Sequence, residues 1–246
     1  MSTALASALE SIRVQRPRSV VVFTGAGVSA ESGIPTFRGA GGLWRNFRAE
    51  DLATPEAFAR DPATVWEWYE WRRDLIRQAE PNAAHRAIAR LDALVVTQNV
   101  DGLHARAGSQ RLIELHGNIV RVRCVRGHRA YEAPEPFPPE ALPPHCSECG
   151  ALLRPDVVWF GEMLPPGAME RATEAIRAAD LLLVVGTSGV VYPAAGLVAV
   201  HHGLSIEINP QASGVSSACT FAIPSTAGEA VPPIVDALLA LREEVQ

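Results

Sequence analysis

Short uninterrupted runs of hydrophobic residues recur along this chain, and each is rich in Val, Leu or Ile. The runs occupy residues 19–23, 93–97, 181–185 and 204–208. They lack the polar alternation of half-exposed strands, which is typical of a parallel sheet covered on both faces. Segments with helical spacing lie between and after them, at residues 82–92, 168–179 and 229–243. This alternation predicts an α/β fold, a Rossmann-like parallel sheet with helices on both faces.

Two segments interrupt the alternation. Residues 37–80 have a mostly helical pattern, whereas residues 119–156 combine a strand-like start, a Pro-rich stretch and Cys146-Ser147-Glu148-Cys149-Gly150. The second segment is typical of a small β-rich insert with a metal knuckle, similar to a zinc ribbon. We expect the sheet domain itself to consist of residues 1–36, 81–118 and 157–246.

A glycine-rich loop, Gly25-Ala26-Gly27, follows the first hydrophobic run. Glycines there let the backbone approach a pyrophosphate, and a helix opening next aims unpaired N–H groups at the anion. By itself the pattern is a weak dinucleotide signal, because the usual acidic ribose ligand about 20 residues further on is not found. Pro35 and Gly39 stop any helix from continuing, so Phe37 and Arg38 are expected on an irregular loop beside the phosphates.

Composition and charge exclude several classes of protein. With 246 residues, 48% of them hydrophobic, the chain can form one large globular domain with inserts. Its net charge of −5 and the lack of a basic cluster argue against nucleic-acid binding. The start of the chain does not have the pattern of a secretion signal, so the four cysteines indicate a reducing, cytoplasmic setting. The long uncharged run between Asp180 and Glu207 contains glycines and Pro193, which fits a strand, a loop and a packed helix better than a membrane span.

Further motifs follow the glycine-rich loop in a fixed order. They are Thr97-Gln98-Asn99-Val100-Asp101-Gly102-Leu103-His104, Glu114-Leu115-His116-Gly117-Asn118, Val157-Val158-Trp159-Phe160-Gly161-Glu162, Gly186-Thr187-Ser188 and Ile208-Asn209. Together they resemble the sirtuins, NAD-dependent protein lysine deacylases, over nearly the whole chain. The resemblance implies NAD as a consumed co-substrate and acylated lysine-containing proteins as partners. It also implies that residues 37–80 and 119–156 pack together as a small domain.

His116 is the candidate general base. It follows an apolar stretch at residues 112–115, so its ring is expected at a strand end, where open α/β sheets bind ligands. An imidazole titrates near neutral pH and can take a proton from a ribose hydroxyl. A hydrogen-bonded structural histidine is the alternative for an isolated residue, and the resemblance favours the catalytic role. The other histidines outside the metal-binding insert are interpreted as structural or exposed: His85, His104, His201 and His202.

The resemblance also implies a reaction. The acyl-lysine carbonyl oxygen attacks the ribose C1′ as nicotinamide leaves, and His116 then activates the ribose so that its 2′ oxygen captures the acyl carbon. In this scheme Asn99 and Asp101 hold the nicotinamide amide and ribose, and Phe37 shields the cationic intermediate. The residues expected to bind NAD are Gly25, Ala26, Gly27, Ser29, Ser32, Phe37, Arg38, Trp44, Gln98, Asn99, Asp101, Gly186, Thr187, Ser188, Asn209 and Ala227.

The metal-binding pattern of the family is incomplete in this chain. Sirtuins carry two Cys-x-x-Cys pairs, of which only Cys146 and Cys149 form an intact pair. The partner position of Cys124 is Gly127, with His128 one residue later. A structural zinc site made of Cys124, His128, Cys146 and Cys149 is chemically ordinary, and a degenerate site that holds no metal is the alternative. Cys219 is expected in a buried strand and is excluded as a ligand.

A Tyr-x-x-Arg pair in the helical insert bears on the acyl group. Tyr69 and Arg72 share one face of a predicted helix, and a guanidinium beside a phenol suits a carboxylate. Such a face can also be merely amphipathic. The segment resembles the desuccinylase and demalonylase branch (class III) of the sirtuins, with Ala53 as the small residue that widens the pocket. Val157 and Phe160, in a strand-like segment, are expected to contact substrate by β-augmentation.

The sequence therefore predicts an NAD-dependent protein lysine deacylase that removes succinyl or malonyl groups, and also acetyl. An ADP-ribosyltransferase is the alternative within the family. A non-catalytic NAD-sensing interaction module is disfavoured because His116, Asn99 and Asp101 are all present. An ordinary nicotinamide oxidoreductase does not explain the interruption at Pro35-Thr36-Phe37-Arg38.

Overall fold

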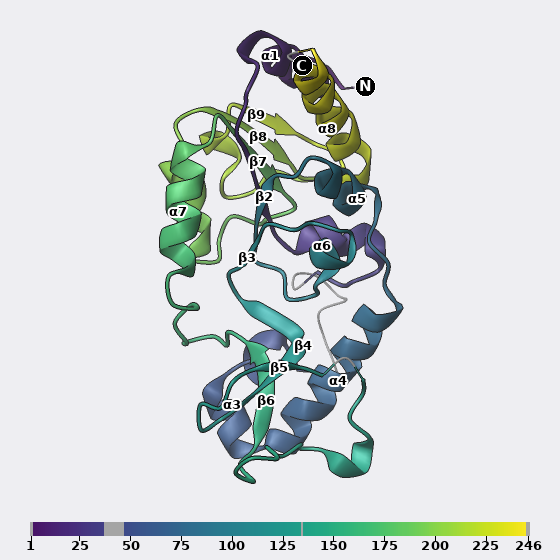
Figure 1. Ribbon diagram of the computed structural model, residues 1–246, viewed down its shortest axis with the longest axis vertical. Coiled ribbons are helices and arrows are strands. Elements are labelled where there is room, and N and C mark those ends of the chain that lie inside the picture. Colours follow the sequence, from purple (N-terminus) through teal and green to yellow (C-terminus); the bar gives the residue numbers. More distant parts are fainter. Residues whose placement is uncertain (1, 37–46, 134, 245–246) are drawn as a thin grey trace.

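The computed structural model describes residues 2–36, 47–133 and 135–244 (Figure 1). A six-stranded sheet has the order β3-β2-β1-β7-β8-β9, and every neighbouring pair is parallel. Its strands are β1 (Val20–Thr24), β2 (Leu94–Thr97), β3 (Leu112–Glu114), β7 (Leu181–Val185), β8 (Leu204–Ile208) and β9 (Phe221–Ile223). The four hydrophobic runs coincide with β1, β2, β7 and β8 to within one residue, which confirms the predicted parallel sheet.

Both faces of the sheet are covered, because successive side chains of its strands enter two separate cores. Val22 and Leu183 pack with helices α1 (Thr3–Gln15), α5 (Ala83–Arg90) and α8 (Ala227–Glu243). Phe23 and Leu182 face the other way, towards α7 (Ala168–Ala178) and the 3₁₀ helix at Ala194–Val200. Figure 1 shows α7 on one side of the sheet and α8 and α5 on the other. This double coverage explains the uninterrupted hydrophobic runs.

The predicted helices are present with small changes at their ends. α5 and α7 lie within the expected ranges, and α8 begins two residues before the predicted position 229. The uncharged run after Asp180 consists of β7, a loop, the 3₁₀ helix and β8, as predicted. No helix in the described part of the chain is both long and apolar enough to cross a membrane.

The two inserts share a third core at the other end of the molecule (Figure 1). One insert supplies α2 (Ala49–Leu52), α3 (Pro55–Arg60) and α4 (Pro62–Gln78). The other supplies an antiparallel sheet of order β5-β4-β6, made of β5 (Tyr131–Glu132), β4 (Gly117–Cys124) and β6 (Leu153–Val157). β4 starts two residues before the expected boundary at 119. The short helix α6 (Leu103–Arg106) lies between this part and the large sheet.

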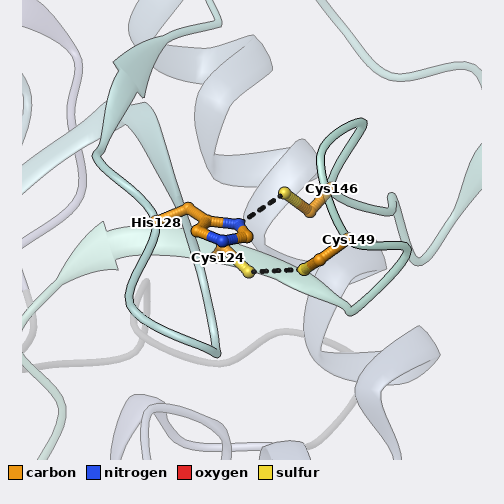
Figure 2. A group of neighbouring side chains, drawn as sticks. All are labelled: Cys124, His128, Cys146 and Cys149. Carbon is orange, nitrogen blue, oxygen red and sulfur yellow. Dashed lines mark hydrogen bonds between the residues drawn. The ribbon is translucent and has the colours of Figure 1, made fainter.

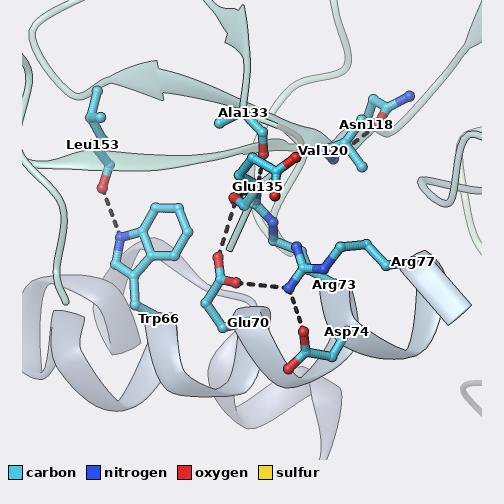
Figure 3. A network of polar contacts seen from close by, with 10 residues as sticks. All are labelled: Trp66, Glu70, Arg73, Asp74, Arg77, Asn118, Val120, Ala133, Glu135 and Leu153. Atoms are coloured by element: carbon cyan, nitrogen blue, oxygen red, sulfur yellow. Dashed lines mark hydrogen bonds and ion pairs between the residues drawn. The ribbon is translucent and has the colours of Figure 1, made fainter. Parts of the chain in front are cut away.

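Helix α4 is tied to the second insert by buried polar groups (Figure 3). The Trp66 indole N–H donates to the Leu153 carbonyl at 2.8 Å. Arg73 is fully buried, pairs with Glu70 at 3.2 Å, and donates to the backbone carbonyls of Ala133 and Glu135. Trp66 and Arg73 therefore belong to the buried face of α4.

The sequence expectation for Cys219 was wrong in one respect. Cys219 follows a short 3₁₀ turn at Ser216–Ala218, and the strand β9 begins only at Phe221. The thiol is partly buried and lies outside the group of metal-ligating residues formed in the second insert.

Candidate functional site

The predicted NAD-binding motifs meet at the carboxyl edge of the large sheet. β1, β2, β7 and β8 are parallel, so the loops that follow them lie side by side. The Gly25 N–H donates to the Val185 carbonyl at 3.0 Å, and the Gly27 N–H donates to the Gly186 carbonyl at 2.8 Å. The structure thus brings the first and third of these loops into direct contact.

The side chains of this edge reinforce the same arrangement. The Gln98 amide donates to the Thr187 hydroxyl at 3.0 Å, and the Asn209 amide donates to the Thr187 carbonyl at 2.8 Å. Ser188 is half-buried, and its carbonyl accepts from the Gly214 N–H at 3.0 Å. Residues from all four strand ends therefore build one continuous surface.

The glycines of the first loop allow its close contact with the loop at Gly186, in addition to any role in phosphate binding. A Cβ at Gly25 would lie 2.9 Å from the Gly186 oxygen, and a Cβ at Gly27 would lie 2.7 Å from the Gly186 Cα. Real Cβ atoms do not approach backbone this closely, so a side chain at either position would push the loops apart. The following helix is a single 3₁₀ segment, Ala26–Ser32, and ends at Gly33 with φ +82.

A buried polar cluster lies beneath these loops. The Ser29 hydroxyl donates to Asp101 at 2.7 Å, and it accepts from the Asn99 amide at 3.1 Å. The Leu103 N–H donates to the other Asp101 oxygen at 2.9 Å. Burial raises the pKa of Asp101, and these hydrogen bonds partly offset the rise. Asn99 and Asp101 are thus held rigidly at the same edge of the sheet.

Two buried histidines lie next to this cluster on its interior side. His85 and His104 are both buried, with ring centroids 4.8 Å apart. His104 Nε2 lies 3.1 Å from the Thr24 hydroxyl, and His85 Nε2 lies 3.5 Å from the Ser29 hydroxyl. Burial lowers the pKa of His85 to about 4 and that of His104 to about 3, so both rings are neutral near pH 7. Of the remaining two histidines interpreted as structural or exposed, His201 is half-buried and His202 is exposed.

His116 lies two residues after the end of β3, in the short turn that leads into β4, close to the predicted strand end. Its Nδ1 lies 2.9 Å from the Gln98 carbonyl oxygen. A carbonyl can only accept, so Nδ1 carries the hydrogen and the lone pair is on Nε2. Burial lowers the pKa of His116, which keeps the ring neutral at physiological pH. A neutral imidazole with an available Nε2 lone pair is the form that a general base needs.

The far end of the predicted NAD site shows a contact that the sequence did not indicate. Glu31 accepts from the Thr226 hydroxyl at 3.0 Å and from the Gly228 N–H at 2.6 Å. It thereby joins the 3₁₀ segment Ala26–Ser32 to the start of α8, where Ala227 lies. No sequence spacing signals a pair nearly 200 residues apart. Ser32 faces the protein, where its hydroxyl accepts from the Asn82 amide at 3.0 Å.

Three residues predicted to bind NAD, Phe37, Arg38 and Trp44, lie outside the described residues.

The predicted acyl-binding residues lie on α4 and just after α2. Tyr69 is fully buried, and burial raises its pKa to about 12. The Arg72 guanidinium carbon lies 5.0 Å from the Trp68 ring centre and 6.0 Å from the Tyr69 ring centre. Desolvation lowers the pKa of Arg72, while the charges of Tyr69 and Asp101 act against this shift. Arg72 thus lies next to two aromatic side chains of α4, and Asp101 is near enough for its charge to act on the guanidinium.

The segment 157–162 differs from its prediction as a strand for substrate pairing. β6 ends at Val157, and a turn begins at Phe160. The Val158 N–H donates to the His116 carbonyl and the Phe160 N–H donates to the Ala53 carbonyl, both at 2.9 Å. The backbone N–H groups of Val158 and Phe160 are therefore already hydrogen-bonded within the protein and cannot pair with a substrate strand. The Val157 side chain is buried, whereas the Phe160 side chain is 48% exposed.

The four predicted metal ligands converge in the second insert (Figure 2). The ligand atoms of Cys124, His128, Cys146 and Cys149 all lie within 4.8 Å of one another. His128 Nδ1 lies 3.3 Å from the Cys146 sulfur, and this contact lowers the pKa of the Cys146 thiol to about 6. The Cys124 and Cys149 sulfurs are 3.6 Å apart. Three sulfurs and one imidazole nitrogen fit the tetrahedral donor set that zinc prefers.

Comparison with known proteins identifies the family. The Sir2 family model matches residues 25–193. An NAD-dependent protein deacylase 2 of Pyrobaculum aerophilum is 54% identical over 227 residues, which cover 89% of this chain and 90% of that protein. An NAD-dependent protein deacylase of Aquifex aeolicus is 55% identical over 207 residues, with 80% and 86% covered.

Solved structures agree with this result. A Sir2 homologue in complex with NAD superposes with a TM-score of 0.86 at 44% identity, covering 98% of this chain and 95% of that one. A mutant Sir2 homologue in complex with 2′-O-acetyl ADP ribose gives 0.89 at 42% identity, with 100% and 98% covered. A Sir2 complex with a p53 peptide and NAD+ gives 0.82 at 30% identity, with both chains fully covered. The sheet-edge site, the Cys₃His cluster and these matches lead to one conclusion: the chain belongs to the Sir2 family.

Proposed function

We propose that this chain is an NAD-dependent protein lysine deacylase that prefers acidic acyl groups, succinyl or malonyl, to acetyl. The deacylase assignment is supported by the relatives named NAD-dependent protein deacylase and by the neutral His116 beside Asn99 and Asp101. The acyl preference is carried by one observation, the Arg72 guanidinium next to the buried Tyr69, with its carbon 6.0 Å from the Tyr69 ring centre.

NAD, when bound, supplies an electrophilic ribose carbon and the hydroxyl that receives the acyl group. In this proposal the first glycine-rich loop holds the phosphates, and Asn99 and Asp101 hold the nicotinamide amide and its ribose. His116 takes the ribose hydroxyl proton at Nε2 as that oxygen bonds to the acyl carbon. One water is consumed, and the products are free lysine, nicotinamide and O-acyl-ADP-ribose. Phe37 and Arg38 keep the shielding and phosphate roles expected from the sequence.

The acyl group enters between α4 and the sheet edge. A succinyl or malonyl carboxylate there meets the half-buried guanidinium of Arg72, and a guanidinium–carboxylate pair is strong and directional. An acetyl group brings no charge and leaves Arg72 without its substrate anion. A site built for a charged substrate group discriminates strongly against an analogue without it, because the charge-assisted hydrogen bonds to that group are then lost. Ala53 leaves room for the longer chain, and its carbonyl is fixed by the Phe160 N–H.

The test is a panel of peptides with succinyl-, malonyl- or acetyl-lysine, incubated with NAD and followed by mass. We expect a higher kcat/KM for the acidic acyl groups, and Arg72→Met should lower it for succinyl by about 10- to 100-fold. Arg77→Met on the same helix is the control, because Arg77 pairs with Glu70 and Asp74 and should leave the succinyl-to-acetyl ratio unchanged. A parent enzyme that prefers acetyl contradicts the acyl assignment. Peptide that gains ADP-ribose instead of losing its acyl group indicates a transferase.

The remaining parts of the chain support this activity. We infer that residues 37–80 and 119–156 act as a small domain and that its Cys₃His cluster holds one structural zinc. Zinc there would fix the loop before β6 to the end of β4, without a part in the chemistry. Three thiol ligands require reducing conditions, which supports a cytoplasmic setting. Acylated proteins are the partners, contacted by the exposed Phe160 side chain.

A further inference from the structure

Trp159 follows β6 and is held from every side. Its ring is 3% exposed, stacks against the Arg154 guanidinium at 3.3 Å from the ring centre, and contacts Phe58 with centroids 5.1 Å apart. The Trp159 N–H of the backbone donates to Glu162 at 2.9 Å. The direction of the indole N–H is therefore restrained by the contacts of the ring with Arg154 and Phe58.

Arg154, which holds one face of the indole, is itself fixed. It forms two hydrogen bonds with Glu162, at 2.6 and 2.8 Å, and a third with the Val157 carbonyl at 2.9 Å. A two-pronged pair of this kind restrains the guanidinium plane. Trp159, Arg154 and Glu162 thus form one rigid unit behind the proposed acyl pocket.

The indole N–H of this unit is aimed at Tyr69. It donates to the Tyr69 hydroxyl oxygen at 2.8 Å, and both groups are buried. An indole N–H can only donate, so the phenol oxygen accepts here and its own hydrogen points elsewhere. Among the described residues this hydrogen has no acceptor. The phenol stays protonated, because burial raises its pKa to about 12.

We propose that Trp159 is a positioning residue for acyl selectivity, whose indole N–H holds the Tyr69 hydroxyl with its hydrogen directed at the carboxylate of an acidic acyl group. This inference rests on the proposed function. By accepting from the indole, the phenol becomes a stronger donor, since hydrogen bonds in a chain polarise one another. Arg72 supplies the charge, and Trp159 sets the direction of the second hydrogen bond through Tyr69.

The experiment removes the indole N–H and measures kcat and KM for matched succinyl- and acetyl-lysine peptides. Trp159→Phe should lower kcat/KM for succinyl by about tenfold, mainly through KM, with little change for acetyl. Trp66→Phe is the matched control, because Trp66 is also buried and donates its N–H to the Leu153 carbonyl in the same core. That control should leave the succinyl-to-acetyl ratio as in the parent.

A merely structural role is separated by Tyr69→Phe. If Trp159 acts through Tyr69, then Trp159→Phe should cause no further loss of the ratio in the Tyr69→Phe background. Replacement of Trp159 by benzothienylalanine keeps the ring and deletes only the N–H, and it gives the same readout should the smaller phenyl ring prevent folding. A parent that prefers acetyl overturns the proposed function. A parent that prefers succinyl, with a ratio unchanged by both Trp159 replacements, overturns this inference alone.

Discussion

A single carbonyl decides how His116 can act. The Gln98 oxygen occupies Nδ1 at 2.9 Å, so the proton is held on that nitrogen and the lone pair on the other. The two residues belong to different motifs, 18 positions apart, and parallel pairing of β2 and β3 brings them together. The fold therefore fixes the tautomer of His116 before any substrate binds.

Replacement of His116 by Ala should abolish deacylation and leave NAD binding largely intact. Loss of a general base costs about 10²- to 10⁴-fold in rate, whereas the loops that would hold NAD are fixed by contacts that do not involve this ring. Turnover by mass and NAD binding by calorimetry are the two measurements. His202→Ala, at an exposed position, serves as the control. Deacylation at the parent rate would falsify the role given to His116.

The residues of the site could be named from the sequence more completely than their contacts. The strand-end argument placed His116 at the ligand-binding edge of the sheet, and the resemblance to the sirtuins placed Asn99 and Asp101 in the same site. The Glu31 link to α8 and the Trp159 bond to Tyr69 could not be predicted, because each joins segments with no common motif or spacing. Sequence periodicity places a residue on a face, and only tertiary packing selects its partner.

The second insert shows how a short element depends on a few side chains. β5 has two residues, and the sheet β5-β4-β6 is closed at its far end by the Cys₃His cluster. One ligand comes from the end of β4, one from the turn after it, and two from the loop that precedes β6. The spacing in the sequence was enough to propose this ligand set, although the family's second Cys-x-x-Cys pair is broken at Gly127.

Purified protein should therefore contain one zinc per chain by elemental analysis. Cys146→Ser should release the metal and lower the Tm by about 5–10 °C, which corresponds to a few kcal/mol for a chain of this length. Cys219→Ser, outside the cluster, should keep both the zinc and the Tm. A metal content well under one per chain, with activity that survives strong chelation, would show that the cluster is degenerate.

Secondary structure was predictable where both faces of an element are buried. β1, β2, β7 and β8 matched their hydrophobic runs, whereas the strand expected over 157–162 ended at Val157. In that segment the Trp159 side chain is buried in the core. The Trp159 backbone N–H donates to the Glu162 carboxylate, a contact that belongs to a turn and not to a strand. So short a strand-like segment carries no periodicity that could place its end, and burial of one large aromatic side chain decides where the strand stops.

At the scale of the whole molecule, three cores are joined through polar groups. Two cores cover the large sheet and one fills the inserts. The buried pair of His85 and His104 lies under the edge where these parts meet, next to Ser29 and Asp101. Because both rings are kept neutral by burial, the folded state binds their protons far less readily than the unfolded chain does.

The free energy of unfolding should consequently fall as the pH drops below about 6.5, the pKa of histidine in the unfolded chain, and continue to fall towards pH 3. Each ring contributes on the order of 3 to 5 kcal/mol over this range, from its pKa of about 4 or about 3. Asp101 acts with the opposite sign, because its pKa is raised, and Arg86 adds to the lowering for His85. Urea unfolding from pH 7.5 to 4.5 measures the slope.

Variants isolate the histidine contribution to that slope. His85→Gln and His104→Gln should each flatten the dependence of stability on pH, whatever they cost at neutral pH. His202→Gln, on the surface, should leave the slope as in the parent. A parent-like slope in both buried variants is the result that contradicts the assignment.

The strand order also determines which parts of the fold can form first while the chain is being synthesised on the ribosome. β1 emerges among the first strands, yet one of its two neighbours in the sheet is β7, which begins only at Leu181. Among the described residues, the buried members of the core shared by the inserts lie between Ala49 and Trp159, so they are translated before β7. During synthesis the core shared by the inserts can therefore form first. At that stage β1 can pair with β2 but not yet with β7, which has not been translated.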